Sequence, residues 1–189
     1  MDFTIKGPKI NIPERISIRK PLLVIGSCFA ENIGTTLREQ LFDVQINPFG
    51  IVYNPISIAQ QLMYITRFKE FTANDLFEYN GLWHSWQHHG SFASADQDEV
   101  LTKINFQVEE AYQQIKKAEW LIITLGTAYY YSLIDGQIVS NCHKVPANNF
   151  VKKIASESQI VVFFEKLFKQ LQKTNPNIKI QFNVSPVRY

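Results

Sequence analysis

The side chains best suited to covalent chemistry lie in the segment VIGSCFAENIG, which runs from Val24 to Gly34. A hydrophobic run stops at Gly26, and Ser27 and Cys28 follow directly before an expected helix. A serine hydroxyl or a cysteine thiolate attacks acyl carbons, so either residue is a candidate nucleophile. A thiol at a helix N-terminus also lies near unpaired N–H groups and the positive end of the helix dipole, which favour the thiolate.

Both residues have a structural interpretation as well. Serine is a favoured N-cap residue, and cysteine is among the residue types that are most often buried. We therefore interpret Ser27 first as a helix cap and only second as a catalytic residue. Cys28 stays open between an inert buried thiol and a reactive site residue.

The four histidines form a second group of candidates. His84, His88 and His89 lie in the aromatic segment WHSWQHHG, and His143 follows Cys142. Three histidines within six positions suggest a metal site, but no acidic or thiol ligand lies nearby at a usual spacing. Two adjacent histidines would also point to opposite sides of a strand. We predict that no metal or cofactor binds, and that the histidines line a substrate pocket or pack within a hairpin.

The composition is that of an ordinary globular protein of about one domain. Of the 189 residues, 46% are hydrophobic and 19% are charged, and the formal net charge is +2. Basic residues are scattered, so nothing favours nucleic acid as a partner. The N-terminus lacks a signal-peptide pattern, and no apolar run approaches the roughly 18 residues of a membrane span. We expect a cytoplasmic protein with no membrane association and two free thiols.

Hydrophobic spacing predicts alternating strands and helices, with two hairpins inserted between them. The hairpins turn at Asn80-Gly81 and at Asp135-Gly136. Ser94 and Gln97 have the spacing of a capping box before a long helix. In chain order, the main elements expected are a strand at 21–26, a helix at 30–41, a strand at 43–46, helices at 54–68 and 101–118, a strand at 119–126, a helix at 160–171 and a strand at 177–186.

This alternation is typical of an α/β fold with an open, mostly parallel sheet. Such sheets bind ligands beyond the carboxyl ends of their strands. Three segments should meet at that edge: Gly26 to Cys28, Gly126-Thr127 and Ser185-Pro186. The sequence therefore predicts a site at this edge.

Several ordered motifs resemble those of the GSCFA family: GSCFAENIG, NPFGIVYNP, WHSWQHHG, LGTA and VSPVR. That family is grouped with the SGNH, or GDSL-like, hydrolases. The resemblance implies a flavodoxin-like three-layer α/β/α sandwich. It also implies ester hydrolysis or acyl transfer, on a substrate that the motifs do not identify.

The resemblance also suggests roles for individual residues. In GDSL hydrolases the first strand leads into Gly-Asp-Ser, which places Cys28 of this chain at the position of the nucleophile. Stabilisation of the oxyanion would come from the N–H groups of Cys28 and Gly50. Gly126 and Thr127 occupy the place of the usual Gly-x-Asn, so the asparagine is missing there, and Asn54 or Asn47 is a candidate to replace it.

One part of the hydrolase pattern is not found. Relatives carry Asp-x-x-His downstream of SPVRH, whereas this sequence has no Asp-x-x-His and ends in SPVRY, with Tyr189 in the place of a histidine. We expect a single domain over residues 1–189 that is incomplete at its C-terminal side, with an impaired catalytic apparatus.

Two function classes follow from these residues. The first is an esterase or acyltransferase acting on an ester of a small molecule, a carbohydrate or a cell-envelope component. The second is a domain that binds a small ligand, a sugar or a protein without turnover, through aromatic residues such as Trp83, Trp86 and Tyr129 to Tyr131. A missing strand would leave a sheet edge unpaired, and such an edge favours pairing with another chain, either a second copy or a partner protein.

Overall fold

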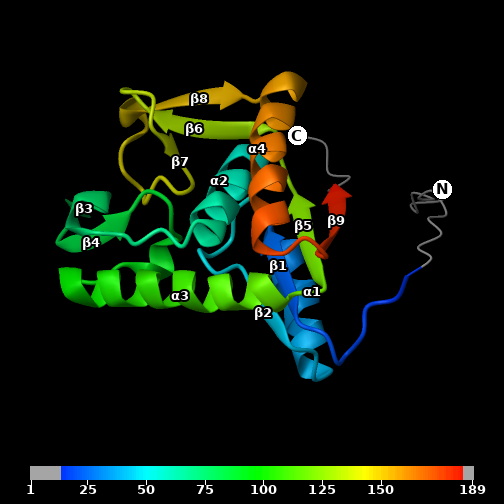
Figure 1. The fold of residues 1–189 in the computed structure, drawn as a ribbon. Coiled ribbons are helices and arrows are strands. Elements are labelled where there is room, and N and C mark those ends of the chain that lie inside the picture. Colours follow the sequence, from blue (N-terminus) through cyan, green and yellow to red (C-terminus); the bar gives the residue numbers. More distant parts are fainter. Residues whose placement is uncertain (1–13, 185–189) are drawn as a thin grey trace, which may run out of the picture.

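The fold is built on a parallel four-stranded sheet, seen in the computed structural model, which describes residues 14–184 (Figure 1). All three strand pairings are parallel, and the sheet is flanked by helices, so the predicted α/β class is confirmed. In spatial order the strands are β2 (Val44–Ile46), β1 (Leu22–Gly26), β5 (Trp120–Leu125) and β9 (Lys179–Val184).

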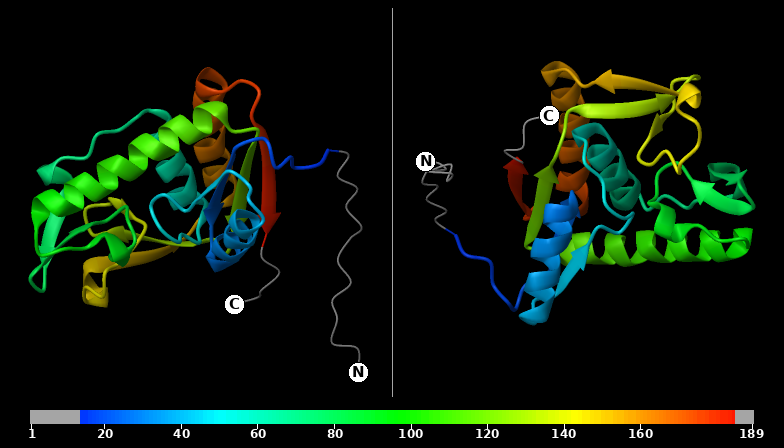
Figure 2. Two further views of the ribbon diagram at one scale, coloured as in Figure 1. Left: turned by 90° about the horizontal axis from the view of Figure 1, so that it is seen from below. Right: turned by 180° about the vertical axis from the view of Figure 1, so that it is seen from behind.

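Both faces of the sheet are covered, because the central strands are hydrophobic on both sides. In β1, Leu23 and Ile25 face one cluster of buried side chains, whereas Leu22 and Val24 face another. The second cluster includes Ala30 of helix α1, which lies on the opposite side of the sheet from the other helices (Figure 2). The result is a three-layer α/β/α sandwich. The helices are α1 (Cys28–Glu39) on one face, and α2 (Pro55–Thr66), α3 (Gln97–Lys117) and α4 (Glu157–Thr174) on the other.

Two small antiparallel sheets are inserted into this sandwich, and both predicted hairpin turns are confirmed. Asn80 and Gly81 have positive φ angles of 53° and 75°, as a tight two-residue hairpin turn requires. Gly136 likewise has a φ of 95°. The first sheet pairs β3 (Leu76–Tyr79) with β4 (Leu82–Ser85). The second sheet has the spatial order β7 (Ile138–Val139), β6 (Tyr129–Leu133) and β8 (Phe150–Ile154). The described residues also form three short 3-10 helices: η1 (Ala73–Asp75), η2 (Gly90–Phe92) and η3 (Ala147–Asn149).

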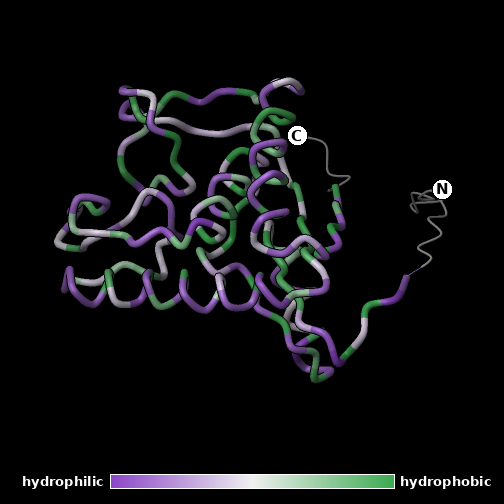
Figure 3. The backbone as a smooth tube through the Cα atoms, viewed as in Figure 1, coloured by the Kyte–Doolittle hydropathy of each residue, from purple (hydrophilic) through white to green (hydrophobic). Residues whose placement is uncertain are grey.

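The start of α3 differs from the prediction. The N-cap is Asp96, whose side chain accepts hydrogen bonds from the backbone N–H groups of Asp98 and Glu99. Ser94 instead accepts a hydrogen bond from the N–H of Asp96, so the capping box at Ser94 and Gln97 is wrong. Both serine and aspartate are good N-caps, and spacing alone did not separate them. Hydrophilic and hydrophobic residues alternate along α3 (Figure 3).

Strand β9 is the outermost strand of the sheet within the described residues. Phe182 and Val184 of this strand are exposed. Pairing of this edge with a second copy stays a prediction. Light scattering on the purified protein tests it: we expect the mass of a dimer, and a strictly monomeric mass would contradict the prediction.

Ser185-Pro186, the third segment predicted at the edge of the sheet, lies outside the described residues. Within the part of the chain that the structure describes, no helix has the length and apolar character needed to cross a membrane.

Candidate functional site

The turn from β1 into α1 depends on Gly26. Its φ angle is +140°, and a Cβ atom added there would lie 2.2 Å from the carbonyl oxygen of Thr124 on β5. The N–H of Gly26 donates to Oδ1 of Asn47 at 2.8 Å, and its carbonyl oxygen accepts from the N–H of Val52 at 3.0 Å. The backbone therefore turns sharply here while it remains in contact with both neighbouring segments.

Ser27 and Cys28 take different positions in this turn. Ser27 is buried, and its Oγ accepts a hydrogen bond from the N–H of Phe29 at 3.3 Å, so Ser27 is the N-cap of α1. Cys28 is the first helical residue and is exposed. Its thiol makes no hydrogen bond to any described residue. The turn thus presents the sulfur of Cys28, rather than the hydroxyl of Ser27, to an incoming molecule.

The loop after β2 is fastened to the same turn. Nδ2 of Asn47 donates to Oε2 of Glu31 in α1 at 2.7 Å. The N–H of Gly50 donates to the carbonyl oxygen of Asn47 at 2.7 Å, and the N–H of His89 donates to the carbonyl oxygen of Phe49 at 2.8 Å. A Cβ atom on Gly50 would lie 2.2 Å from Cβ of His89. The N–H of Gly50 is therefore occupied, and it would have to give up this bond before it could stabilise an oxyanion.

The segment after β5 lies beside the loop that leads into α2. The N–H groups of Gly126 and Thr127 both donate to the carbonyl oxygen of Tyr53, at 2.8 and 3.2 Å. Oδ1 of Asn54 accepts from the N–H of Ser57 at 2.8 Å, so this side chain caps α2. The ends of β1 and β5 lie side by side, since Gly26 pairs with Thr124, but the N–H of Gly126 and the side-chain carbonyl group of Asn54 already have partners.

A pocket of about 320 Å³ opens at this end of the sheet, between the β5 loop and the sheet formed by β6 and β8. Of the residues predicted for the catalytic site it contains Asn54 and Thr127, but not Cys28. Tyr130, which we expected to be exposed, points the other way and is buried. The lining residues are Tyr53, Asn54, Thr127, Tyr129, Tyr131, Ser140 and Lys152.

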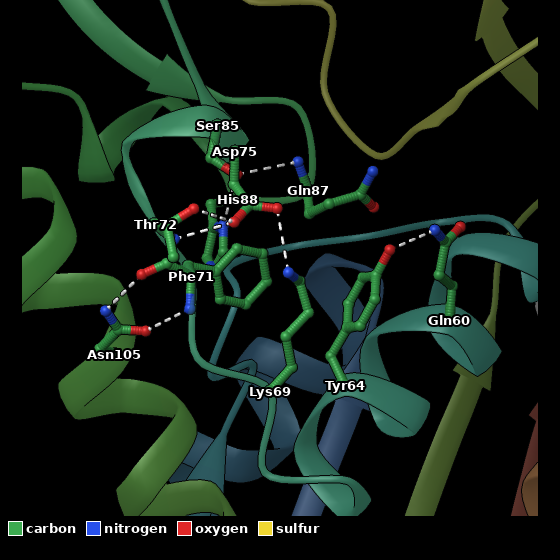
Figure 4. A network of polar contacts seen from close by, with 10 residues as sticks. All are labelled: Gln60, Tyr64, Lys69, Phe71, Thr72, Asp75, Ser85, Gln87, His88 and Asn105. Atoms are coloured by element: carbon green, nitrogen blue, oxygen red, sulfur yellow. Dashed lines mark hydrogen bonds and ion pairs between the residues drawn. The ribbon is translucent and has the colours of Figure 1, made fainter.

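Of the two roles expected for the histidines, His88 has the packing role, because it is entirely buried in the core (Figure 4). Its ring stacks on Phe49 with a centroid distance of 4.3 Å and meets Phe71 edge-on at 4.9 Å. Nδ1 lies 2.9 Å from Oγ of Ser85, while Nε2 has no partner among the described residues. His88 therefore supports the loop of Phe49 and Gly50 from behind.

The other three histidines line a second pocket, of about 450 Å³. Nε2 of His143 donates to the carbonyl oxygen of Ser85 at 2.8 Å, which leaves Nδ1 of His143 as an acceptor with no partner among the described residues. His89 accepts from the N–H of Ser91 at 3.3 Å, and the buried Nδ1 of His84 is likewise unpartnered. Within residues 14–184, no three histidine, cysteine or acidic side chains are grouped so that they could hold a metal ion.

Burial keeps two of these histidines neutral. Desolvation lowers the pKa of His88 from 6.5 to about 3, with a further contribution from His143. Desolvation also lowers the pKa of His143 to about 4, against the opposing effect of its hydrogen bond to Ser85. Burial raises the pKa of the Cys142 thiol. At neutral pH these groups are uncharged, and such weakly basic imidazoles are poor proton acceptors.

The buried His88 makes the stability of the fold depend on pH. Between pH 6.5 and about 3 the unfolded chain binds a proton at this residue that the folded chain does not, so stability falls as the pH falls. We expect His88 alone to lower the free energy of unfolding by about 3 kcal/mol between pH 7 and pH 4. Urea denaturation at several pH values measures this effect. The variant His88→Phe keeps the ring but cannot titrate, and an unchanged pH slope in this variant would contradict the prediction.

Comparison with known proteins agrees with the motifs at this site. The model of the GSCFA family matches residues 21–189, which include the β1 turn, the loop after β2, the histidine segment and the β5 loop. No curated protein and no solved structure matches the chain. Because the family model spans nearly the whole sequence, the chain belongs to the GSCFA family.

Proposed function

We propose that this protein is a hydrolase or acyltransferase that acts on an ester at the carboxyl edge of its sheet, with Cys28 as the nucleophile. The observation that carries the proposal is the exposed thiol of Cys28 on the first turn of α1, next to loops from two neighbouring strands. Membership of the GSCFA family supports a hydrolase-like activity. The SGNH-type resemblance of its motifs supports ester chemistry in particular.

The proposed reaction has two steps. The thiolate of Cys28 attacks the acyl carbon, the carbon–oxygen bond to the alcohol breaks, and the departing alkoxide takes a proton from water. Water then hydrolyses the thioester to release the acid and restore the thiol, or an acceptor alcohol takes the acyl group instead. The N–H of Phe29 is already hydrogen-bonded to Ser27, so the other N–H groups of the first helical turn would stabilise the negative charge on the acyl oxygen.

With the groups that residues 14–184 provide near Cys28, catalytic turnover should be slow. No histidine makes a hydrogen bond to Cys28 among these residues, and the sequence contains no Asp-x-x-His. Removal of the thiol proton therefore falls to solvent. A thiolate needs less help from a base than a serine hydroxyl does, so slow acyl transfer remains compatible with this site.

The second candidate function is binding of a small ligand without turnover. The N–H groups of Gly50 and Gly126 both donate to carbonyl oxygens at 2.7 and 2.8 Å, which favours this alternative. A site that keeps these bonds when a ligand binds has fewer donors for an oxyanion. Detection of an acylated cysteine would separate the two functions, because binding alone leaves the thiol unmodified.

Alkylation of the thiols tests whether the site is formed. Iodoacetamide should modify Cys28 in the folded protein at neutral pH, because its thiol lies exposed on the first helical turn. Cys142 is half-buried, burial raises its pKa, and it serves as the internal comparison within one peptide digest. If Cys28 reacts only after the protein is unfolded, the catalytic proposal is wrong.

A further inference from the structure

The pocket beside the β5 loop has an unusual lining for a surface hollow. Tyr129 and Tyr131 are two residues apart on β6, so their rings share one face of the small sheet. Each is 38% exposed, and neither hydroxyl makes a hydrogen bond to a described residue. Tyr53 adds a third ring from the loop before α2. A tyrosine ring has an apolar face and a polar rim, which suits a ligand with the same two properties.

The pocket also holds a positive charge that no acidic side chain balances. Lys152 lies directly opposite Tyr131 across the β6–β8 pairing, and its Nζ lies 4.2 Å from the centroid of the Tyr129 ring. Among the described residues Lys152 makes no ion pair, and the lining contains no aspartate or glutamate. The position of the ammonium group over the ring is therefore set by packing within the pocket rather than by a carboxylate of the protein.

We propose that this pocket binds an anionic sugar. The C–H faces of a pyranose ring would lie against the tyrosine rings, its hydroxyl groups would reach the tyrosine hydroxyls and Thr127, and its carboxylate or phosphate would pair with Lys152. The volume of about 320 Å³ lies within the range of small-molecule sites. The proposal adds a binding site to the proposed function and does not depend on it, because Cys28 does not line this pocket.

Calorimetric titration of the Cys28→Ala variant tests binding without turnover. We expect glucuronate and glucose 6-phosphate to bind at least about tenfold more tightly than glucose, and more tightly than acetate or inorganic phosphate, because both the ring and the charge are recognised. Lys152→Met should reduce the affinity for both anionic sugars to that for glucose. Binding of only one anionic sugar would identify its carboxylate or its phosphate as the group that the pocket selects, and would still support the proposal.

The neighbouring lysine provides a matched control. Lys153 pairs with the buried Tyr130 and so points away from the pocket, and Lys153→Met makes the same change in net charge. This variant should bind as the parent protein does. Equal losses in the two variants, or equal binding of glucose and glucuronate, would overturn the proposal. Failure of sugar binding together with normal acylation of Cys28 would refute the pocket alone, whereas sugar binding without acylation would refute only the nucleophile.

Discussion

Gly26→Ala should lower the free energy of unfolding by about 3–5 kcal/mol, since a forced contact and an unfavourable backbone conformation add together. The new Cβ would lie 2.2 Å from the backbone oxygen of Thr124, and a backbone atom in the middle of a sheet cannot move aside. The φ angle of +140° is one that residues with a side chain rarely adopt. Chemical denaturation of the purified variant measures the loss, and insoluble expression would be its extreme form.

Gly81→Ala is the matched control for this substitution. Gly81 also has a positive φ angle, of +75°, but a Cβ atom there would meet nothing within 4 Å. Gly81→Ala should therefore lower the free energy of unfolding only through the unfavourable backbone conformation, by about 1–2 kcal/mol. If the two variants lose the same stability, the close contact between β1 and β5 at Gly26 is not what determines the shape of the turn.

Cys28→Ala should abolish hydrolysis of an activated ester such as p-nitrophenyl acetate, down to the rate of the buffer blank. The activated ester is chosen because its leaving group departs without a proton, so the lack of a general acid near Cys28 does not limit the assay. The side chain is exposed and makes no hydrogen bond to a described residue, so its truncation should leave the fold intact. Release of nitrophenol, recorded together with a thermal melt, measures both properties.

The other thiol provides the control for this assay. Cys142→Ala should keep the activity of the parent, because Cys142 lies after the second hairpin and burial raises its pKa. Ser27→Ala should retain the nucleophile but lose a helix cap, at a cost of about 1 kcal/mol in stability. Equal activity of Cys28→Ala and the parent protein would show that any hydrolysis occurs elsewhere.

Elements with a strong hydrophobic pattern were predictable from the sequence. Strands β1 and β5 are continuous apolar runs that end near glycine, and this pattern requires burial on both faces. The two hairpin turns follow from residues that tolerate positive φ angles. Strand β8 was missed because its sequence FVKKI is short and contains two charged residues among five, and because its partner β6 is not adjacent to it in the chain.

The site was predictable only in outline. The order of strands places Gly26 and Gly126 near one edge, so local pattern and sheet topology suffice to bring them together. The partners of individual N–H groups depend on tertiary contacts, which is why the occupied N–H of Gly50 was not foreseen. The same applies to His88, since nothing in its sequence neighbourhood distinguishes a buried ring from one that lines a pocket. The role of Lys152 required knowledge of β8.

The catalytic role of Cys28 is tested most directly by mass spectrometry of the protein after brief exposure to p-nitrophenyl acetate. We expect one acetyl group, carried as a hydroxylamine-sensitive thioester on the peptide that contains Cys28, and formed faster in the folded protein than in urea. Cys142 in the same digest should remain largely unmodified. Absence of the thioester on Cys28, or its formation at the same rate in folded and unfolded protein, would contradict the proposal that the β1–α1 turn is a catalytic site.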